Sequence, residues 1–207
     1  MFAKVNKTLF IIILLIGGLL LSACGDPKLK PLSSGATIVA FGDSLTEGVG
    51  ASEAASYPNQ LSIITGLNVV NAGISGETTD RGLARFEDVL EQYSPELVIL
   101  LEGGNDILRN HNQNQTKQNL AQMIDIAKQH NVQVLLMGVP EKNLFSSVAG
   151  FYDELAEEHE MAYMREVIAD LLKTQKYKSD QIHLNAQGYR VLAEQIAETL
   201  KDEGALP

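Results

Sequence analysis

The residues best suited to chemistry are a serine near the start of the chain and an aspartate and a histidine near its end. Ser44 follows the apolar run 37–40, and His183 follows Asp180 by three residues. At that spacing a carboxylate in a turn can reach the imidazole Nδ1 and fix its tautomer. Such an imidazole can deprotonate a serine hydroxyl, which is otherwise a poor nucleophile. A serine after a strand can also be the N-cap of the next helix, so both roles stay open.

Acyl transfer also needs donors for the oxyanion that forms during attack. Two glycine-rich stretches offer them, NAGISGET at 71–78 and GGND at 103–106. Glycine permits a positive φ and a close approach of the backbone to a ligand. The N–H groups of Ser44 and Gly76 and the side-chain amide of Asn105 could together supply two or three donors. We expect Asp43 and Asp106 to hydrogen-bond the loops that carry Ser44 and Asn105.

The elements that must position these residues alternate along the chain. We expect strands at 37–42, 67–72, 96–102, 132–138 and 161–164, and helices at 53–65, 79–93, 115–130, 149–160, 165–175 and 186–202. Apolar strands without hairpin signals indicate a parallel sheet covered on both faces. The sequence therefore predicts one α/β domain with three α/β/α layers. Ser44 and both glycine stretches then fall at the carboxyl ends of strands, where open sheets bind ligands.

Composition and spacing count against other kinds of site. Asp180 and His183 are too few ligands for zinc, and no HExxH motif or cysteine cluster completes a metal site. The glycine stretches match neither a Walker motif nor G-x-G-x-x-G, and the G-x-S-x-G elbow is also absent. The formal net charge of −10 argues against binding of nucleic acid or anionic headgroups through charge. We expect no metal, no cofactor and no nucleic acid partner.

The first residues do not belong to the domain. Lys4 and Lys7 precede an apolar run over 9–21, which is too short to span a bilayer as a mature helix but suits a secretory signal. A short membrane anchor is the alternative. Cys24 follows this run and is the only cysteine, so a disulfide within the chain is impossible. A free thiol would be a liability in an oxidising compartment.

The residues Leu21-Ser22-Ala23-Cys24 resemble a bacterial lipobox. The resemblance implies a lipoprotein signal peptide at 1–23, cleavage before Cys24 and acylation of that cysteine. Two or more acyl chains anchor a protein stably, whereas one is marginal. A chance cysteine behind an ordinary signal is the alternative.

The stretch after Cys24 mixes Pro, Lys, Ser and Gly without periodicity. We therefore interpret 24–36 as the lipidated cysteine and a flexible tether, and 37–203 as the domain. Gly25, rather than an aspartate, follows the cysteine. By resemblance to sorting signals this favours a lipid-anchored protein of the bacterial cell envelope, on the outer membrane and facing the periplasm. A monomer is our default expectation.

Four blocks of sequence resemble the SGNH branch of the GDSL hydrolases over about residues 37–200. They are GDSL at 42–45, the glycine block ending in Gly76, GGND at 103–106 and DQIH at 180–183. The resemblance implies a flavodoxin-like fold with a five-stranded parallel sheet. By carry-over onto these positions it implies that Ser44, His183 and Asp180 form a catalytic triad. Ser44, Gly76 and Asn105 would form the oxyanion hole, with Gly73 as the other candidate glycine.

Within that family, ISGETTDRGLARFEDVL and LEGGNDILR resemble the periplasmic thioesterase, lysophospholipase and arylesterase enzymes. This implies hydrolysis of small acyl esters, thioesters or lipids without a metal. The loop 139–148 departs from the family pattern, so the substrate preference does not carry over. A carbohydrate acetyl esterase of the same family is one alternative, and a lipoprotein that binds lipid or glycan without turnover is another.

Overall fold

A computed structural model describes residues 27–142 and 147–207, so the predicted signal peptide and Cys24 lie outside the described residues. Five parallel strands form one sheet in the order β2-β1-β3-β4-β5. This is the flavodoxin-like order, and the predicted fold class is confirmed. The strands are β1 (Thr37–Gly42), β2 (Asn68–Gly73), β3 (Leu97–Leu101), β4 (Gln133–Met137) and β5 (Ala162–Met164).

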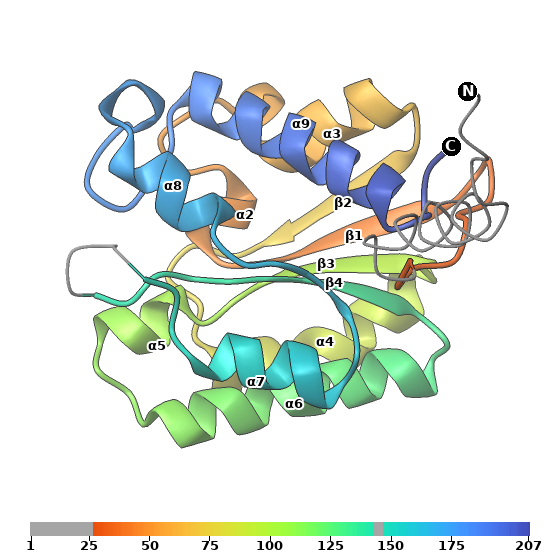
Figure 1. The fold of residues 1–207 in the computed structure, drawn as a ribbon, viewed down its shortest axis with the longest axis horizontal. Coiled ribbons are helices and arrows are strands. Elements are labelled where there is room, and N and C mark those ends of the chain that lie inside the picture. The colour runs from red at the N-terminus through yellow and green to blue at the C-terminus, as the bar shows by residue number, and fades with distance from the viewer. Residues whose placement is uncertain (1–26, 143–146) are drawn as a thin grey trace, which may run out of the picture.

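Helices cover both faces of the sheet, as Figure 1 shows. The upper layer in that view contains α2 (Ser44–Glu47), α3 (Tyr57–Thr65), α8 (Val167–Lys173) and α9 (Ala186–Asp202). The lower layer contains α4 (Thr79–Tyr93), α5 (Gly104–Leu108), α6 (Gln113–Gln129) and α7 (Phe151–Glu158). Short 3-10 turns lie at Glu53–Ala55 and Gln175–Tyr177.

The core is made by the central strands and one apolar face of each long helix. Every residue of β3 is buried, as expected for a strand covered on both sides. In α9 the fully buried Leu192, Ile196 and Leu200 recur every four residues, which places them on one face of the helix. Each buried side chain of this size contributes about 1.5–3 kcal/mol relative to an exposed one. Burial of these side chains therefore fixes the positions of β1 and α9 relative to the sheet core, and these two elements position the candidate site.

The structure differs from the predicted helices at three places. Ser56 interrupts the helix predicted over 53–65, and Pro58 stands in the first turn of α3, where its missing N–H costs nothing. The helices α2 and α5 were not predicted, because four or five residues are too few for a periodic pattern. Elsewhere the boundaries agree or move by one or two residues, and α8 ends before the 3-10 turn at Gln175–Tyr177.

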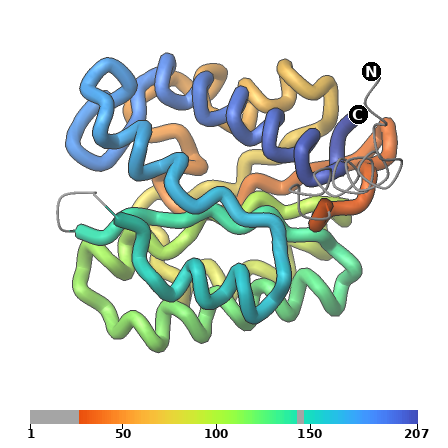
Figure 2. The backbone as a smooth tube through the Cα atoms, in the orientation of Figure 1, coloured from red at the N-terminus to blue at the C-terminus, as the bar shows by residue number. Residues whose placement is uncertain are grey.

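Residues 27–36 are not the flexible tether that the composition indicates. Leu29 is buried, its N–H donates to the Glu203 carbonyl, and the Leu32 N–H donates to the Ala205 carbonyl. Ala205 is itself buried, beyond the expected domain end at 203. Figure 2 shows this segment beside the C-terminus, at one end of the sheet. These backbone hydrogen bonds and contacts to the side chains of Glu96, Gln133 and Glu203 hold the segment in place, and they leave no pattern in its composition.

Candidate active site

Ser44 lies at the carboxyl end of β1, as the first residue of α2. The N-cap of that helix is Asp43, whose carboxylate accepts from the Leu45 N–H at 3.1 Å, so Ser44 is not the cap. Gly42 makes the turn possible, because a Cβ at this position would lie 1.9 Å from the Leu101 carbonyl oxygen. Because Asp43 supplies the cap, the Ser44 hydroxyl is free for another partner.

That partner is His183. The Ser44 Oγ lies 3.0 Å from the His183 Nε2, and the His183 Nδ1 lies 2.8 Å from the Asp180 Oδ2. The other oxygen of Asp180 accepts from the backbone N–H groups of Ile182 and His183, both at 2.8 Å. Burial alone would raise the pKa of Asp180, but the imidazole and these N–H groups outweigh it and hold the pKa below its ordinary value. The carboxylate is therefore ionised and aimed at the imidazole.

Gly76, rather than Gly73, faces the cavity beside Ser44. Gly76 has φ +76°, and within the described residues its N–H has no hydrogen-bond partner. The Gly73 N–H donates to the Asn71 side chain at 3.0 Å. A Cβ on Gly73 would lie 2.1 Å from the Glu47 nitrogen, so the close packing of β2 on α2 requires this glycine. Of the two candidates, only Gly76 offers a free donor to the site.

Asn105 belongs to α5 and is held by Asp43. Its Nδ2 donates to the Asp43 Oδ2 at 3.2 Å. Burial raises the pKa of Asp43 to about 6, although the Leu45 N–H, the nearby His183 and the Asn105 amide act against the rise. At neutral pH the carboxylate can only accept, so it selects the rotamer in which the amide nitrogen of Asn105 faces the site. The expectation that Asp43 bonds the loops of Ser44 and Asn105 agrees with these contacts.

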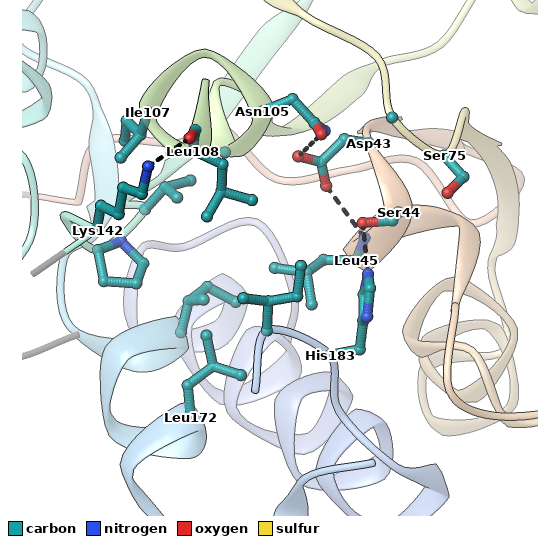
Figure 3. Close-up of a pocket in the computed structure, with 16 residues that line it drawn as sticks. Asp43, Ser44, Leu45, Ser75, Asn105, Ile107, Leu108, Lys142, Leu172 and His183 are labelled. Carbon is teal, nitrogen blue, oxygen red and sulfur yellow. Dashed lines mark hydrogen bonds between the residues drawn. The ribbon is translucent and has the colours of Figure 1, made fainter. Parts of the chain in front are cut away.

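A cavity of about 170 Å³ opens beside the Ser44 hydroxyl (Figure 3). This is comparable to an apolar cavity of about 150 Å³ that holds benzene. Its polar end carries Ser44, Gly76, Asn105 and His183. The rest of the wall is mostly apolar and comes from α2, α5, α8 and the loops after β4 and before His183, namely Leu45, Ile107, Leu108, Val139, Pro140, Ile168, Leu172 and Ile182. Lys142 lies at the wall, where it donates to the Leu108 carbonyl.

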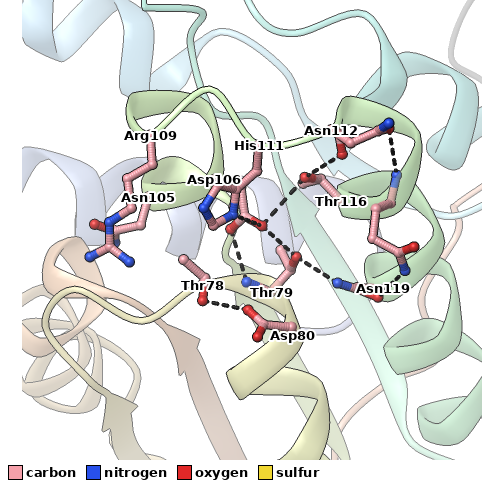
Figure 4. Close-up of polar contacts among 12 residues, drawn as sticks. Thr78, Thr79, Asp80, Asn105, Asp106, Arg109, His111, Asn112, Thr116 and Asn119 are labelled. Atoms are coloured by element: carbon pink, nitrogen blue, oxygen red, sulfur yellow. Dashed lines mark hydrogen bonds and ion pairs between the residues drawn. The ribbon is translucent and has the colours of Figure 1, made fainter.

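Asp106 ties α5 to the start of α4 (Figure 4). Its two oxygens accept from the N–H and the hydroxyl of Thr79 at 2.9 and 2.8 Å. The Asn119 amide in α6 donates to the same hydroxyl at 3.0 Å. Arg109 donates to the Gly76 carbonyl at 3.0 Å. The loops that carry Gly76 and Asn105 are therefore fastened to each other and to the helical layer.

Glu102 is a buried carboxyl that sequence reasoning assigned no role. It directly precedes Gly103, is fully buried, and accepts from the Gly103 N–H through Oε1. Its Oε2 has no hydrogen-bond partner within the described residues. Burial, followed by the charges of Asp43 and Glu77, raises the pKa of Glu102 well above its ordinary range. The neutral acid is therefore the favoured form. The only sequence signal was a glutamate in an otherwise apolar strand end.

Comparison with known proteins agrees with this architecture. Residues 40–191 match the GDSL-like Lipase/Acylhydrolase family. Over 176 residues the chain is 34% identical to the thioesterase 1/protease 1/lysophospholipase L1 of Escherichia coli K12, covering 80% of this chain and 83% of that one. It is 29% identical over 174 residues to an arylesterase of Vibrio mimicus, covering 79% and 87%.

The crystal structure of TesA superimposes with a TM-score of 0.73 at 28% identity and covers 81% of this chain and 99% of that one. The fold and the order of the blocks along it define the class, that of the SGNH ester hydrolases. The chain belongs to the GDSL-like lipase/acylhydrolase family.

Proposed function

We propose that the protein hydrolyses acyl esters through Ser44, His183 and Asp180, with Ser44, Gly76 and Asn105 as the oxyanion hole. One observation carries the proposal. The Ser44 hydroxyl, hydrogen-bonded to the imidazole that Asp180 orients, stands at the wall of an apolar cavity. Nucleophile, base and orienting group are then in hydrogen-bond contact next to space for an acyl group.

In the proposed reaction the Ser44 Oγ attacks the ester carbonyl while the His183 Nε2 takes the hydroxyl proton. The oxyanion is stabilised by the N–H groups of Ser44 and Gly76 and the Asn105 amide, each contributing about 2.7–4 kcal/mol. His183 then gives its proton to the leaving alcohol or thiol, and an acyl-Ser44 remains. Water attacks this acyl group with His183 again as base, which releases the acid and restores Ser44. Asp180 stays ionised throughout and stabilises the imidazolium.

The proposed substrate is a small acyl ester, thioester or lysolipid whose acyl group enters the cavity. The mostly apolar wall favours a hydrocarbon chain or an aromatic group over a sugar. An apolar wall gives no hydrogen-bond partner to glycan hydroxyls, so this feature favours an acyl esterase over a carbohydrate acetyl esterase. Rates on acetyl-xylan and on medium-chain acyl esters, measured side by side, distinguish the two.

We further propose that residues 1–23 are removed and that acylated Cys24 anchors the protein to the envelope, on the outer membrane and facing the periplasm. The lipobox-like residues before Cys24 support this proposal. Within the part of the chain that the structure describes, no helix is long and apolar enough to cross a bilayer. Mass spectrometry of the N-terminal peptide from the native host tests the acylation, and fractionation of the envelope tests the membrane.

The decisive experiment is intact-mass spectrometry after treatment with a fluorophosphonate. We expect one adduct on the wild-type protein and none on Ser44→Ala, because only a serine activated by a neighbouring base reacts. A folded wild-type protein that forms no adduct and hydrolyses no ester between pH 6 and 9 would contradict the proposal. Saturable binding of a lipid or glycan that Ser44→Ala leaves unchanged would then favour the non-catalytic lipoprotein.

A further inference from the structure

The first segment that the structure describes, from residue 27, is docked at the amino edge of the sheet, where the strands begin. The Lys30 N–H donates to the Gln133 side chain at 2.6 Å, and Gln133 opens β4. The backbone and hydroxyl of Ser33 both donate to the carboxylate of Glu96, which immediately precedes β3. The Lys28 N–H donates to the Glu203 side chain at 2.9 Å. This segment therefore joins the body of the protein at a defined place.

The candidate active site lies at the opposite, carboxyl edge of the same strands. Figure 1 shows the segment from residue 27 at one end of the molecule, and α5 and α8 toward the other. Ser44 follows β1 and Asn105 follows β3, whereas Glu96 and Gln133 stand where β3 and β4 begin. Strands of five or six residues separate the two edges by about 17–20 Å.

The chain between Cys24 and the docked segment is short. Three peptide units separate Cys24 from Pro27, and even a fully extended chain of that length spans only about 11 Å. A compact domain of about 180 residues has a radius of gyration of about 16 Å and is therefore about 40 Å across. Because a tether of about 11 Å is much shorter than the domain, a domain anchored at Cys24 cannot rotate far enough to bring its carboxyl edge to the anchoring leaflet.

Three lysines line a hollow at the amino edge. They are Lys28, Lys30 and Lys128, and they line it together with His159 and one acidic side chain, Glu160. Glu96 and Glu203 also lie at this edge, so the three lysines are a feature of the hollow and not of the edge as a whole. Each lysine near an anionic leaflet contributes about 1 kcal/mol of attraction. The overall charge argued against headgroup contact, but this local cluster lies at the edge to which the anchor would hold the membrane.

We propose that the amino edge of the sheet is the membrane-facing surface of the anchored protein and that the active-site cavity opens away from the leaflet that holds it. The ester substrate then arrives from the aqueous phase or from an opposing surface, and not from lipids of the anchoring leaflet. The inference rests on the N-terminal anchor of the proposed function. It holds equally for acylated Cys24 and for an uncleaved apolar segment, because both precede residue 27.

The test measures the distance of two surface positions from the bilayer. Ser34→Cys places a thiol on the docked segment, and Asn114→Cys places one at the start of α6, beside the carboxyl edge; both positions are exposed. Each full-length variant is expressed, processed, labelled with a maleimide dye and reconstituted into vesicles of phosphatidylethanolamine and phosphatidylglycerol. These vesicles carry a headgroup-attached energy acceptor. An acylated Cys24 is a thioether and takes no dye, so the wild-type protein is the labelling blank.

We expect severalfold stronger energy transfer from the dye at position 34 than from the dye at position 114. Hydrolysis of a water-soluble ester should proceed at the same rate on vesicles as in detergent. Equal transfer from the two dyes, or stronger transfer from position 114, would overturn the inference. A protein that takes dye at Cys24 and stays off the vesicles overturns it together with the anchor. Ester hydrolysis in the same samples reports the catalytic proposal separately.

A longer tether is the matched control for orientation. About 20 Gly and Ser residues inserted after Asp26 add a flexible span of about 25 Å. With that reach the domain can turn, so the difference between the two dyes should shrink while ester hydrolysis stays unchanged. A difference that persists undiminished would mean that the lysine-lined hollow alone holds the edge on the membrane. Lys28→Glu with Lys30→Glu in the lengthened chain should then abolish the difference, and its survival would refute the orientation by this surface.

Discussion

The Asn105 amide nitrogen lies 3.2 Å from the Asp43 carboxylate, which is 62 residues earlier in the chain and directly before Ser44. This contact joins two parts of the site that different strands carry. Because an ionised carboxylate has no proton to donate, it accepts only the amide nitrogen of Asn105 and so determines which way that side chain points. In the proposed mechanism, Asp43 is therefore a positioning residue for the Asn105 donor.

Asp43→Asn should lower kcat by about 10²–10³ with little change in KM, the loss expected for one oxyanion donor. Asparagine caps helices as well as aspartate does, so α2 keeps its cap. Its own amide nitrogen, however, permits Asn105 to turn its oxygen toward the site. Steady-state kinetics on a soluble ester measure the effect. If the two residues act together, Asp43→Asn combined with Asn105→Ala should lose no more than Asn105→Ala alone.

The same substitution should raise stability at neutral pH. Burial raises the pKa of Asp43 from 3.8 to about 6, so the folded protein binds this proton more tightly than the unfolded chain. The ionised group therefore costs nothing below pH 4, and the cost grows as the pH rises through 6, to about 3 kcal/mol at most. Urea unfolding should show Asp43→Asn more stable than wild type at pH 7.5, with the gap closing near pH 4. A gap that widens toward acid would contradict this sign.

Asp180→Asn should reduce kcat by about 10⁴ while KM stays within a fewfold of its original value. The asparagine oxygen is expected to keep accepting from the Ile182 and His183 N–H groups. Its NH₂ group then faces the His183 Nδ1, which forces the ring proton onto Nε2, where it blocks proton transfer from Ser44. Asp170→Asn, an exposed change on α8 away from the cavity, is the control. A loss of kcat below tenfold for Asp180→Asn would contradict the proposed role of Asp180 in orienting His183.

Thr79→Val should lower the free energy of unfolding by about 1–3 kcal/mol. The substitution removes a hydroxyl that donates to Asp106 at 2.8 Å and accepts from Asn119, and it leaves both of these buried groups short of a partner. Thr116→Val is the matched control, because its hydroxyl contacts the same carboxylate only at 3.4 Å. Urea unfolding of both variants measures the difference. Equal losses would mean that the shorter contact holds α5 no better than the longer one.

Leu172→Ala should shift the substrate preference toward longer acyl chains. Leu172 lines the cavity from α8, and truncating it extends the apolar space. Two further methylenes that become buried there contribute about 1.6 kcal/mol, or about tenfold in the ratio of kcat/KM for long over short esters. Leu171→Ala, buried on the same helix but away from the cavity, should leave the ratio unchanged. If both variants move it equally, the effect comes from a general loosening of α8.

The strands could be predicted from the sequence because each one is a short apolar run. Their parallel direction follows from the helices that connect successive strands. The short helices α2 and α5 could not be predicted, since they hold four and five residues and their positions depend on Gly42 and Gly103 turning the chain. The docking of residues 28–33 could not be predicted from the sequence either. Its partners are backbone carbonyls and the side chains of Glu96, Gln133 and Glu203, and contacts of this kind give no periodic pattern in the sequence.

The residues of the candidate site could be named from the sequence because their types are restricted by the chemistry, and the structure brings Ser44, Asp180 and His183 into contact. Their roles remain predictions until the variants are made. Two features needed coordinates. The resemblance already favoured Gly76 over Gly73, and the coordinates add the physical reason, which is that the Gly73 N–H is already occupied. The buried state of Glu102 depends on how α7 and the loop before α5 close over the strand end, where Tyr152 donates to its carbonyl.

The hydrogen bond between Ser44 and His183 joins positions 139 residues apart, so the contact forms only after both segments have been made and have folded together. A partly synthesised chain holds the serine without the histidine. If the two residues act as proposed, such a chain hydrolyses no ester. The onset of ester hydrolysis in a timed refolding or translation experiment then reports when these two distant segments come together.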